Sequence, residues 1–255
     1  MTSLFDLHCH LYDLPDLDEI IASARDAGVE GVLCVSEDLD SMKKTLDLKA
    51  KYPEFIHAGL GLHPADAMRL SAEKISRTME FMEEHLHEAR IVGEIGLDYK
   101  YAETADERDK QACVLKDQLD LAARFKLGVN LHSRRALRET LDTAAAFHHE
   151  TGLPALLHWF THSSKLIRKA VAEGLFMSAG PAVFYSEETL KTALAIPLEN
   201  LVLETDTPVP FGGVSARPQM VADVARRLAE SRHLSVEDLA GAAHLNSMRL
   251  LSFNP

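Results

Sequence analysis

The sequence has few of the features that mark several large classes of protein. Its 255 residues include only three cysteines, an odd number and too few for a disulfide framework. No apolar run approaches the roughly 18 residues of a membrane-spanning helix, and the first residues lack the basic and apolar segments of a signal peptide. We therefore expect a cytoplasmic protein without a membrane partner.

Basic residues are also scarce. The 27 Lys and Arg stand against 39 Asp and Glu, which gives a net charge of −12 with the 13 histidines neutral. This balance argues against a protein that coats DNA or an anionic membrane, but not against one that handles nucleic acid at a local site. The apolar share of 46% and charged share of 26% exclude a disordered chain. Because no linker-like or repeated segment interrupts the chain, we expect one domain over residues 1–255. We also expect a monomer, and the sequence implies no protein partner.

Short apolar runs alternate with amphipathic helical stretches. The runs are continuously apolar, as expected of strands buried on both faces of a parallel sheet. They cover residues 3–7, 31–35, 55–62, 90–95, 128–132, 154–158, 175–179 and 201–205. Eight such units in about 250 residues predict an α/β fold, the closed (β/α)₈ or TIM barrel. A doubly wound open sheet is the alternative, but the chain lacks the Gly-rich turn that this fold places after its first strand.

The stretches between the runs carry helix signals. Gly28 ends the first helical pattern, and Ser71 has the position of an N-cap residue. Further helices are predicted at residues 39–51, 106–126, 134–150, 163–172 and 186–195, with two more after a Pro/Gly-rich loop at 208–213.

Polar side chains gather where the predicted strands end, which is where barrels carry their active sites. Five of the 13 histidines are found there. These strand-end residues are His8, His10, His63, Glu94, His132, His158 and Asp206. Because alternate residues of a strand share a face, His8 and His10 can point at one ion while Cys9 points the other way. We expect Cys9 to be a packed thiol, although a thiolate would suit zinc.

Glu94 lies within an apolar strand, where a lone carboxylate is costly unless it is paired or binds a metal. A salt bridge to a barrel lysine or arginine is the alternative, but no predicted strand supplies an inward lysine. Gly93 and Gly96 on either side would leave room for close approach.

The other strand-end residues also have simpler interpretations. Asp206 could cap the loop in which Pro208 follows, and His132 or His158 taken singly could be a core histidine. His63 could contact substrate or pack a loop. Together, the imidazoles and carboxylates favour ligands for two divalent ions that share a carboxylate and activate water.

The charge of such a site bears on its substrate. Two cations with Glu94, Asp206 and one hydroxide sum to about +1, which would favour an anionic substrate such as a phosphoester. Mixed nitrogen and oxygen donors suit several divalent metals, so the sequence leaves the metal open.

These residues, in this order, resemble the TatD family of metal-dependent deoxyribonucleases over nearly the whole chain. The matching segments are Phe5–Leu11, Gly61–Pro64, Val92–Tyr99, Gln118–Ala122, His132–Arg134, His158, Glu204–Pro208 and Asn246–Phe253. The sequences Gly-Glu-Ile-Gly-Leu-Asp-Tyr and Glu-Thr-Asp are the most specific parts. The resemblance implies an amidohydrolase-type TIM barrel that cleaves DNA phosphodiesters, typically as a 3′→5′ exonuclease, with Mg²⁺, Mn²⁺ or Zn²⁺.

The resemblance also implies roles for individual residues. One ion would be held by His8, His10, Glu94 and Asp206, and the other by Glu94, His132 and His158. Asp206 would orient or deprotonate the attacking water, and His63 would contact the scissile phosphate. The catalytic set is thus Asp206, Glu94 and His63.

Substrate contacts are expected to be few and local. Arg134 is the basic residue nearest the predicted site, and Trp159 or Tyr99 could stack on a base, although either could be a core aromatic. Other basic residues at 135, 138, 165, 168 and 169 have the pattern of helix surface charge. We therefore expect DNA as substrate, with single strands or ends preferred over duplex.

Two other functions fit the same residues. The site could hydrolyse another ester or amide, such as aminoacyl-tRNA or a small phosphoester, because a fold does not fix a function. The chain could also be a non-catalytic protein that binds metal or a partner. The presence of every proposed ligand favours a hydrolase.

Overall fold

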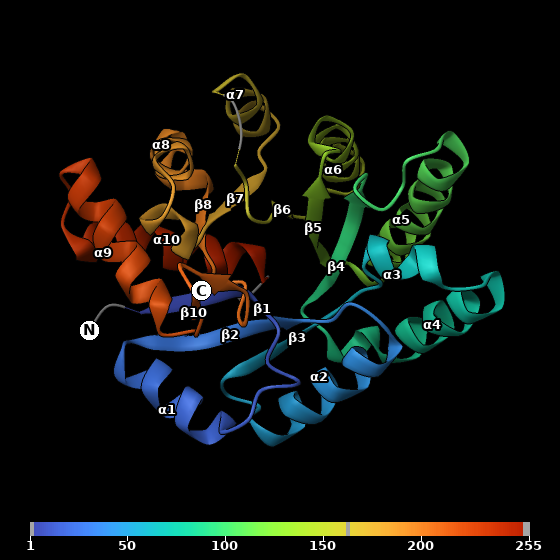
Figure 1. Ribbon diagram of the computed structural model, residues 1–255, viewed down its shortest axis with the longest axis horizontal. Helices are drawn as coiled ribbons and strands as arrows, with labels where there is room; N and C mark the ends of the chain where they lie inside the picture. The colour runs from blue at the N-terminus through green and yellow to red at the C-terminus, as the bar shows by residue number, and fades with distance from the viewer. Residues whose placement is uncertain (1–2, 162–163, 252–255) are drawn as a thin grey trace.

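Eight parallel strands follow one another around a barrel, and the helices lie outside it (Figure 1). The computed structural model describes residues 3–161 and 164–251. The strands are β1 (Leu4–Cys9), β2 (Val29–Val35), β3 (Ile56–Leu60), β4 (Ile91–Asp98), β5 (Gly128–Arg134), β6 (Ala155–Leu157), β7 (Phe176–Ala179) and β8 (Leu201–Leu203). Each strand pairs in parallel with the next, so the predicted α/β barrel is confirmed.

The helices connect successive strands, as βα units require. They are α1 (Leu17–Asp26), α2 (Leu39–Lys51), α3 (Pro64–Arg69), α4 (Ala72–His85), α5 (Ala105–Phe125), α6 (Leu137–Thr151), α7 (Ser164–Ala172), α8 (Glu187–Ala195), α9 (Met220–Arg232) and α10 (Val236–Leu250), with 3₁₀ turns η1 (Leu86–Glu88), η2 (Pro181–Phe184) and η3 (Leu198–Asn200). Ser71 caps α4 as predicted, because its hydroxyl accepts from the backbone N–H of Lys74. Among the helices described, none is both long and apolar enough to cross a membrane.

The barrel wall closes between β8 and β1 by side-chain as well as backbone contacts. An isolated parallel bridge joins Cys9 to Thr207, and the N–H of His10 donates to the Thr207 carbonyl at 2.7 Å. The fully buried carboxylate of Asp6 accepts hydrogen bonds from the backbone N–H and the hydroxyl of Thr205. This closure places the end of β8 directly beside the two histidines of β1.

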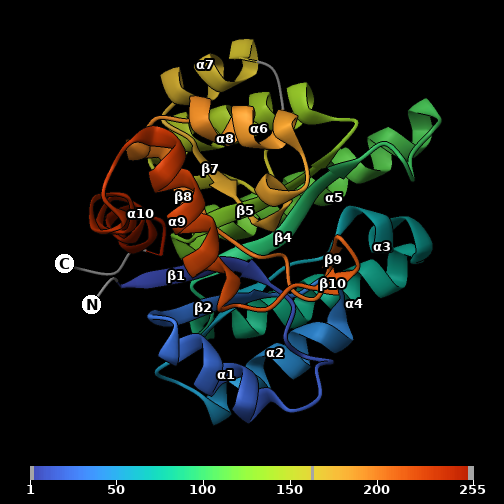
Figure 2. The ribbon, with the colours of Figure 1, turned by 60° about the vertical axis from the view of Figure 1, so that its left-hand side comes forward.

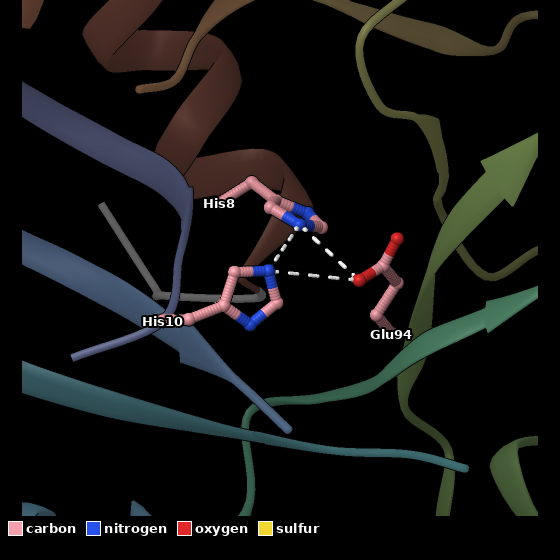
Figure 3. A group of neighbouring side chains, drawn as sticks. All are labelled: His8, His10 and Glu94. Atoms are coloured by element: carbon pink, nitrogen blue, oxygen red, sulfur yellow. Dashed lines mark hydrogen bonds and ion pairs between the residues drawn. The ribbon is translucent and has the colours of Figure 1, made fainter. Parts of the chain in front are cut away.

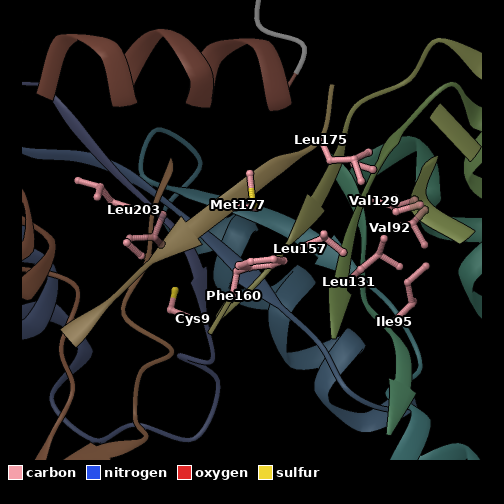
Figure 4. Packing of buried hydrophobic residues seen from close by; sticks show 14 of the residues in the cluster. Cys9, Val92, Ile95, Val129, Leu131, Leu157, Phe160, Leu175, Met177 and Leu203 are labelled. Carbon is pink, nitrogen blue, oxygen red and sulfur yellow. The ribbon is translucent and has the colours of Figure 1, made fainter. Parts of the chain in front are cut away.

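The apolar core is made of residues from the strands and from the helices around them. Figure 4 shows part of this core, mostly side chains of the strands. Cys9 belongs to this core and is fully buried, and its thiol donates to the carbonyl of Leu33. The prediction that Cys9 points away from His8 and His10 is therefore confirmed.

Several predicted boundaries were wrong. β1 continues to Cys9 and β4 to Asp98, so polar residues expected after these strands lie within them. The predicted loop at 208–213 contains part of a small hairpin, β9 (Pro210–Phe211) with β10 (Val214–Ser215) (Figure 2). The predicted helix start at residue 134 is instead the last residue of β5. Residue 163 of another predicted helix and Phe253 of the terminal motif lie outside the described residues.

The glycines beside Glu94 allow a close approach, as predicted. Gly96 has φ 144°, and a Cβ atom there would lie 2.1 Å from the carbonyl oxygen of His132. A Cβ at Gly93 would meet Asn130 at 2.7 Å. Both glycines therefore let β5 approach β4 closely.

Candidate metal centre

The carboxyl ends of the strands surround a cleft of about 820 Å³. All six predicted metal ligands converge there: His8 and His10 from β1 and its end, Glu94 from β4, His132 from β5, His158 after β6 and Asp206 after β8. His8 is fully buried behind the cleft, and the other five line it. The alternative of a salt bridge from Glu94 to a lysine or arginine is not what is observed, since its ion pairs within the described residues are all with histidines.

One oxygen of Glu94 faces the histidines of β1 (Figure 3). Nε2 of His8 lies 3.3 Å from Nε2 of His10, and these two nitrogens lie 3.5 and 3.7 Å from Oε2 of Glu94. Oδ1 of Asp206 lies 3.7 Å from the first nitrogen and 3.4 Å from the second. Ligand atoms bound tetrahedrally to Zn²⁺ lie about 3.4 Å apart. His8, His10 and Glu94 therefore have the spacing of ligands to a single small cation, and Asp206 lies beside both imidazoles.

The other oxygen of Glu94 faces a second pair of histidines. Oε1 lies 2.8 Å from Nδ1 of His132 and 2.9 Å from Nε2 of His158, and these two nitrogens are 3.4 Å apart. The rings of His8 and His158 stack with centroids 3.8 Å apart, which brings the two groups of donors side by side. Glu94 thus divides its two oxygens between two separate sets of imidazoles.

Hydrogen bonds behind the β1 histidines fix which ring nitrogen faces the centre. Nδ1 of His8 lies 3.0 Å from Oδ1 of Asn130, whose amide donates to the carbonyl of Leu7 and is thereby oriented. Nδ1 of His10 lies 3.2 Å from the carbonyl of Val35. Because both partners are acceptors, Nδ1 carries the proton in each ring and Nε2 presents its lone pair to the centre.

Two further carboxylates stand behind the second pair of histidines. Nε2 of His132 lies 3.2 Å from Oδ2 of Asp98, and Nδ1 of His158 lies 3.7 Å from Oε2 of Glu204. Both atoms of the second contact are buried without a hydrogen-bond partner, while the other Glu204 oxygen accepts from the backbone N–H of Trp159. Such outer carboxylates make a ligating imidazole more basic. No role was predicted for Asp98, Glu204 or Asn130, although two of the three lie in strand-end motifs.

The outer carboxylates change the charge of the site. Adding Asp98 and Glu204 to the earlier sum of about +1 makes the whole centre slightly negative when two cations are bound. Attraction for an anionic substrate must then come from the open faces of the cations and from Arg134, which lines the cleft. The positive site predicted from two carboxylates alone was therefore an overestimate.

Burial and neighbouring charges shift the pKa values of the central groups. Burial alone would raise the pKa of Glu94, but the neighbouring imidazoles, foremost those of His158 and His8, hold it well below its usual value. Burial also acts to raise the pKa of Asp206, and the contact with His10 outweighs it and lowers that pKa. Burial lowers the pKa of His10, whereas Asp206 and Glu94 raise it, and the net value is about 9. A bound cation would take the place of these protons.

His63 lies against His132, with ring centroids 4.4 Å apart, but its own hydrogen bonds differ from those of the other histidines. It is the N-cap of α3, where its Nδ1 accepts from the backbone N–H of Ala65 at 3.1 Å. The proton of the neutral ring is therefore on Nε2, which lies 3.8 Å from Oε1 of Glu94 and faces the centre. His63 thus offers a hydrogen-bond donor to a molecule in the cleft.

Of the three predicted substrate contacts, two line the cleft and one does not. Arg134 and Trp159 line the cleft with His63. Tyr99 is not among its lining residues, and the guanidinium of Arg108 lies over the Tyr99 ring, 4.5 Å from its centroid. The basic residues at 135, 138, 165, 168 and 169 are also outside the lining, as expected of surface charge.

The outer carboxylate of Asp98 can be tested on its own. Asp98→Asn keeps the shape of the side chain but removes the charge that supports His132, so metal affinity should fall by about tenfold or more. A metal titration monitored by calorimetry measures this affinity directly. Asp106→Asn, in the exposed first turn of α5, serves as the control. Unchanged affinity in Asp98→Asn would show that the contact with His132 does not support metal binding.

A TIM barrel with imidazoles and carboxylates at its strand ends is an arrangement found in metal-dependent hydrolases. The model of the TatD related DNase family matches residues 5–252, and the chain belongs to this family. It is 29% identical to the human deoxyribonuclease TATDN3, over 97% of this chain and 94% of the relative. It is 31% identical to YabD of Bacillus subtilis, an uncharacterized metal-dependent hydrolase, over 98% of this chain and 100% of the relative. The crystal structure of YjjV, a TatD homologue of Escherichia coli, superposes with a TM-score of 0.86 at 28% identity and covers 98% of both chains.

Proposed function

We propose that this protein hydrolyses DNA phosphodiester bonds with two divalent cations, acting as a 3′→5′ exonuclease on single strands or strand ends. The observation that carries the proposal is the division of Glu94, with one oxygen toward His8 and His10 and the other toward His132 and His158. A carboxylate shared in this way suits a pair of metal ions. The deoxyribonuclease names of relatives support DNA as the substrate.

The proposed ligand sets follow the two groups of donors. His8, His10, Glu94 and Asp206 would hold one cation, and Glu94, His132 and His158 the other. Mg²⁺, Mn²⁺ and Zn²⁺ are the candidates, and when bound they supply an activated water and neutralise charge on the phosphate. Neutral imidazoles in the tautomer described above are the form that binds a metal.

Individual side chains would position the attacking water, the phosphate and a base. The contact with His10 lowers the pKa of Asp206 despite its burial, so its carboxylate is ionised and would orient or deprotonate the attacking water. The Nε2–H of His63 donates to a non-bridging phosphate oxygen, and the hydrogen bond from Ala65 holds the ring for that purpose. Arg134 binds phosphate at the edge of the cleft and Trp159 stacks on a base.

The preference for single strands and ends follows from the sparse positive charge. Duplex binding along its length needs many phosphate contacts, whereas Arg134 is the one Lys or Arg among the residues that line this cleft. A single phosphate held at the metal centre needs no such surface.

The proposed function is tested with a panel of substrates and metals. Single-stranded DNA labelled at the 3′ or the 5′ end should be shortened from its 3′ end in the presence of Mg²⁺, Mn²⁺ or Zn²⁺, faster than blunt duplex. RNA, a small phosphodiester and acyl esters complete the panel. Faster hydrolysis of an acyl substrate or of RNA than of any DNA would contradict the proposal, and products released from the 5′ end would contradict the direction.

A further inference from the structure

A second pocket, of about 390 Å³, lies beside the metal cleft and is walled by aromatic rings. We call it the aromatic pocket, and its apolar lining is Pro181, Phe184, Tyr185, Phe211 and Met220. The lining comes from η2, the β9–β10 hairpin and α9, all of which follow the carboxyl ends of β7 and β8 (Figure 2). Phe184 and Tyr185 are 46% and 57% exposed, so aromatic surface faces solvent at this pocket.

A narrow gap lies between the aromatic pocket and the metal cleft. Trp159 lines the cleft and also borders this gap, together with Asp206 and Phe211. The ring of Trp159 lies 5.4 Å from that of Phe211, which in turn stacks on Tyr185 with centroids 6.4 Å and planes 15° apart. The three rings thus form a row that leads from the metal centre into the aromatic pocket.

The backbone holds this row in place. Trp159 has the left-handed φ of 43°, which costs free energy for a bulky residue, and its N–H is held by Ser178 and Glu204 at 2.8 Å each. In the hairpin, Gly212 passes so close to the Tyr185 ring that a Cβ atom would lie 2.3 Å from it. Glycine at this position therefore allows the hairpin and the ring to pack together.

The charges of the aromatic pocket select the kind of group that it can take. Its charged lining consists of Arg226 and Arg227 with Asp223 and Glu230, so it is neutral overall. Arg226 pairs with Asp223, and Arg227 with Glu230. A phosphate would meet two carboxylates there, whereas a flat uncharged ring would meet aromatic faces.

We propose that the aromatic pocket binds a nucleobase of the DNA strand, namely a base next to the nucleotide whose phosphodiester lies at the metal centre. The base stacks on Tyr185 and Phe211, and Trp159 spans the distance to the reacting phosphate. Every base has a π-face, so such a subsite tolerates sequence and requires an unpaired strand. This inference rests on the proposed function and adds to it a place for a second nucleotide.

The chain offers a matched pair of variants for the test. Gly212→Ala keeps every aromatic side chain but drives a methyl group into the Tyr185 ring. Gly213→Ala is the control, since this neighbour also has a positive φ, of 83°, but a Cβ there would meet nothing within 4 Å. Tyr185→Leu removes the exposed ring and provides a second variant should the first disturb the hairpin.

Binding can be followed through Trp159, which is the only tryptophan of the chain. Titration with single-stranded hexathymidylate in the absence of divalent metal should quench its fluorescence. Gly212→Ala and Tyr185→Leu should weaken this binding, and raise the KM for cleavage, by about 5- to 150-fold, the range of one base stacked on an aromatic ring. Gly213→Ala should change both by less than about threefold. On an oligonucleotide with an abasic second residue, wild type and Tyr185→Leu should bind equally weakly.

Cleavage of DNA by all variants with the wild-type KM would overturn the subsite and leave the proposed function intact. A change of oligomeric state in Tyr185→Leu, with KM unchanged, would also overturn it and identify the pocket as a contact between copies. Failure of the wild-type protein to cleave any DNA would overturn the proposed function and the subsite with it.

Discussion

Glu94→Gln should lower the rate of DNA hydrolysis by more than about 100-fold and reduce the bound metal at the same time. Loss of a residue that only supports a ligand already costs about 10- to 100-fold, and Glu94 faces both groups of donors. The glutamine amide has one oxygen, so its NH₂ must point at one of the two groups. An NH₂ group cannot ligate a cation, and it would face either His8 and His10 or His132 and His158.

Metal content by mass spectrometry, measured on the same sample as the nuclease rate, checks this expectation. Glu188→Gln, a neutralised carboxylate on the exposed face of α8, controls for the loss of one charge and should retain both metal and rate. Full activity in Glu94→Gln with tightly bound metal would refute a shared role for this carboxylate.

Asp206→Asn should lower kcat by about 10²- to 10⁴-fold, the range for loss of a positioned general base, while metal remains at the second group. The donors of that group, Glu94, His132 and His158, make their contacts without Asp206. The expected signature is therefore slow turnover with some metal retained, unlike the combined loss in Glu94→Gln.

The control for this variant is a second aspartate of the same cleft. Asp13 lines the cleft and pairs with Lys44 at 2.9 Å, so Asp13→Asn removes the same charge without touching the centre. Its kcat should stay within about threefold of wild type. If Asp206→Asn hydrolysed DNA at the wild-type rate with metal bound, Asp206 would have no part in proton transfer.

Position along the chain was enough to predict which residues converge. Parallel strands end at one rim of a barrel, so polar residues at the ends of strands far apart in the sequence, such as His8 and Glu94, could be expected to meet. Alternation along β1 likewise predicted that Cys9 packs into the core while its neighbours face the cleft. These arguments depend only on local pattern and topology.

Contacts behind the centre could not be predicted in the same way. The bonds from His8 to Asn130 and from His132 to Asp98 depend on the stagger of neighbouring strands, which the sequence does not specify. The charge sum lacked the outer carboxylates Asp98 and Glu204 for the same reason. The sum from Glu94 and Asp206 alone was therefore too positive. Tyr99 shows the same limit, because the guanidinium of Arg108 covers its ring from another element.

The aromatic pocket could not be predicted, because its residues follow no periodic apolar pattern in the sequence. Phe184 and Tyr185 are neighbours in one connection and Phe211 lies in another, and neither connection has a periodic apolar pattern. A row of rings is created only when the hairpin at Gly212 packs on Tyr185. Short hairpins and 3₁₀ turns such as η2 are too brief to carry a recognisable apolar pattern.

The most direct test of the account is the number of metal ions needed for activity. Metal-free protein is titrated with Mn²⁺ or Zn²⁺, and the initial rate of single-stranded DNA hydrolysis is followed at each addition together with the metal bound. The two groups of donors that share Glu94 predict that the rate reaches its plateau at two ions per chain and that Glu94→Gln never reaches it. A plateau at one ion per chain would contradict a two-metal centre, as would full activity in a chelator that leaves no metal bound.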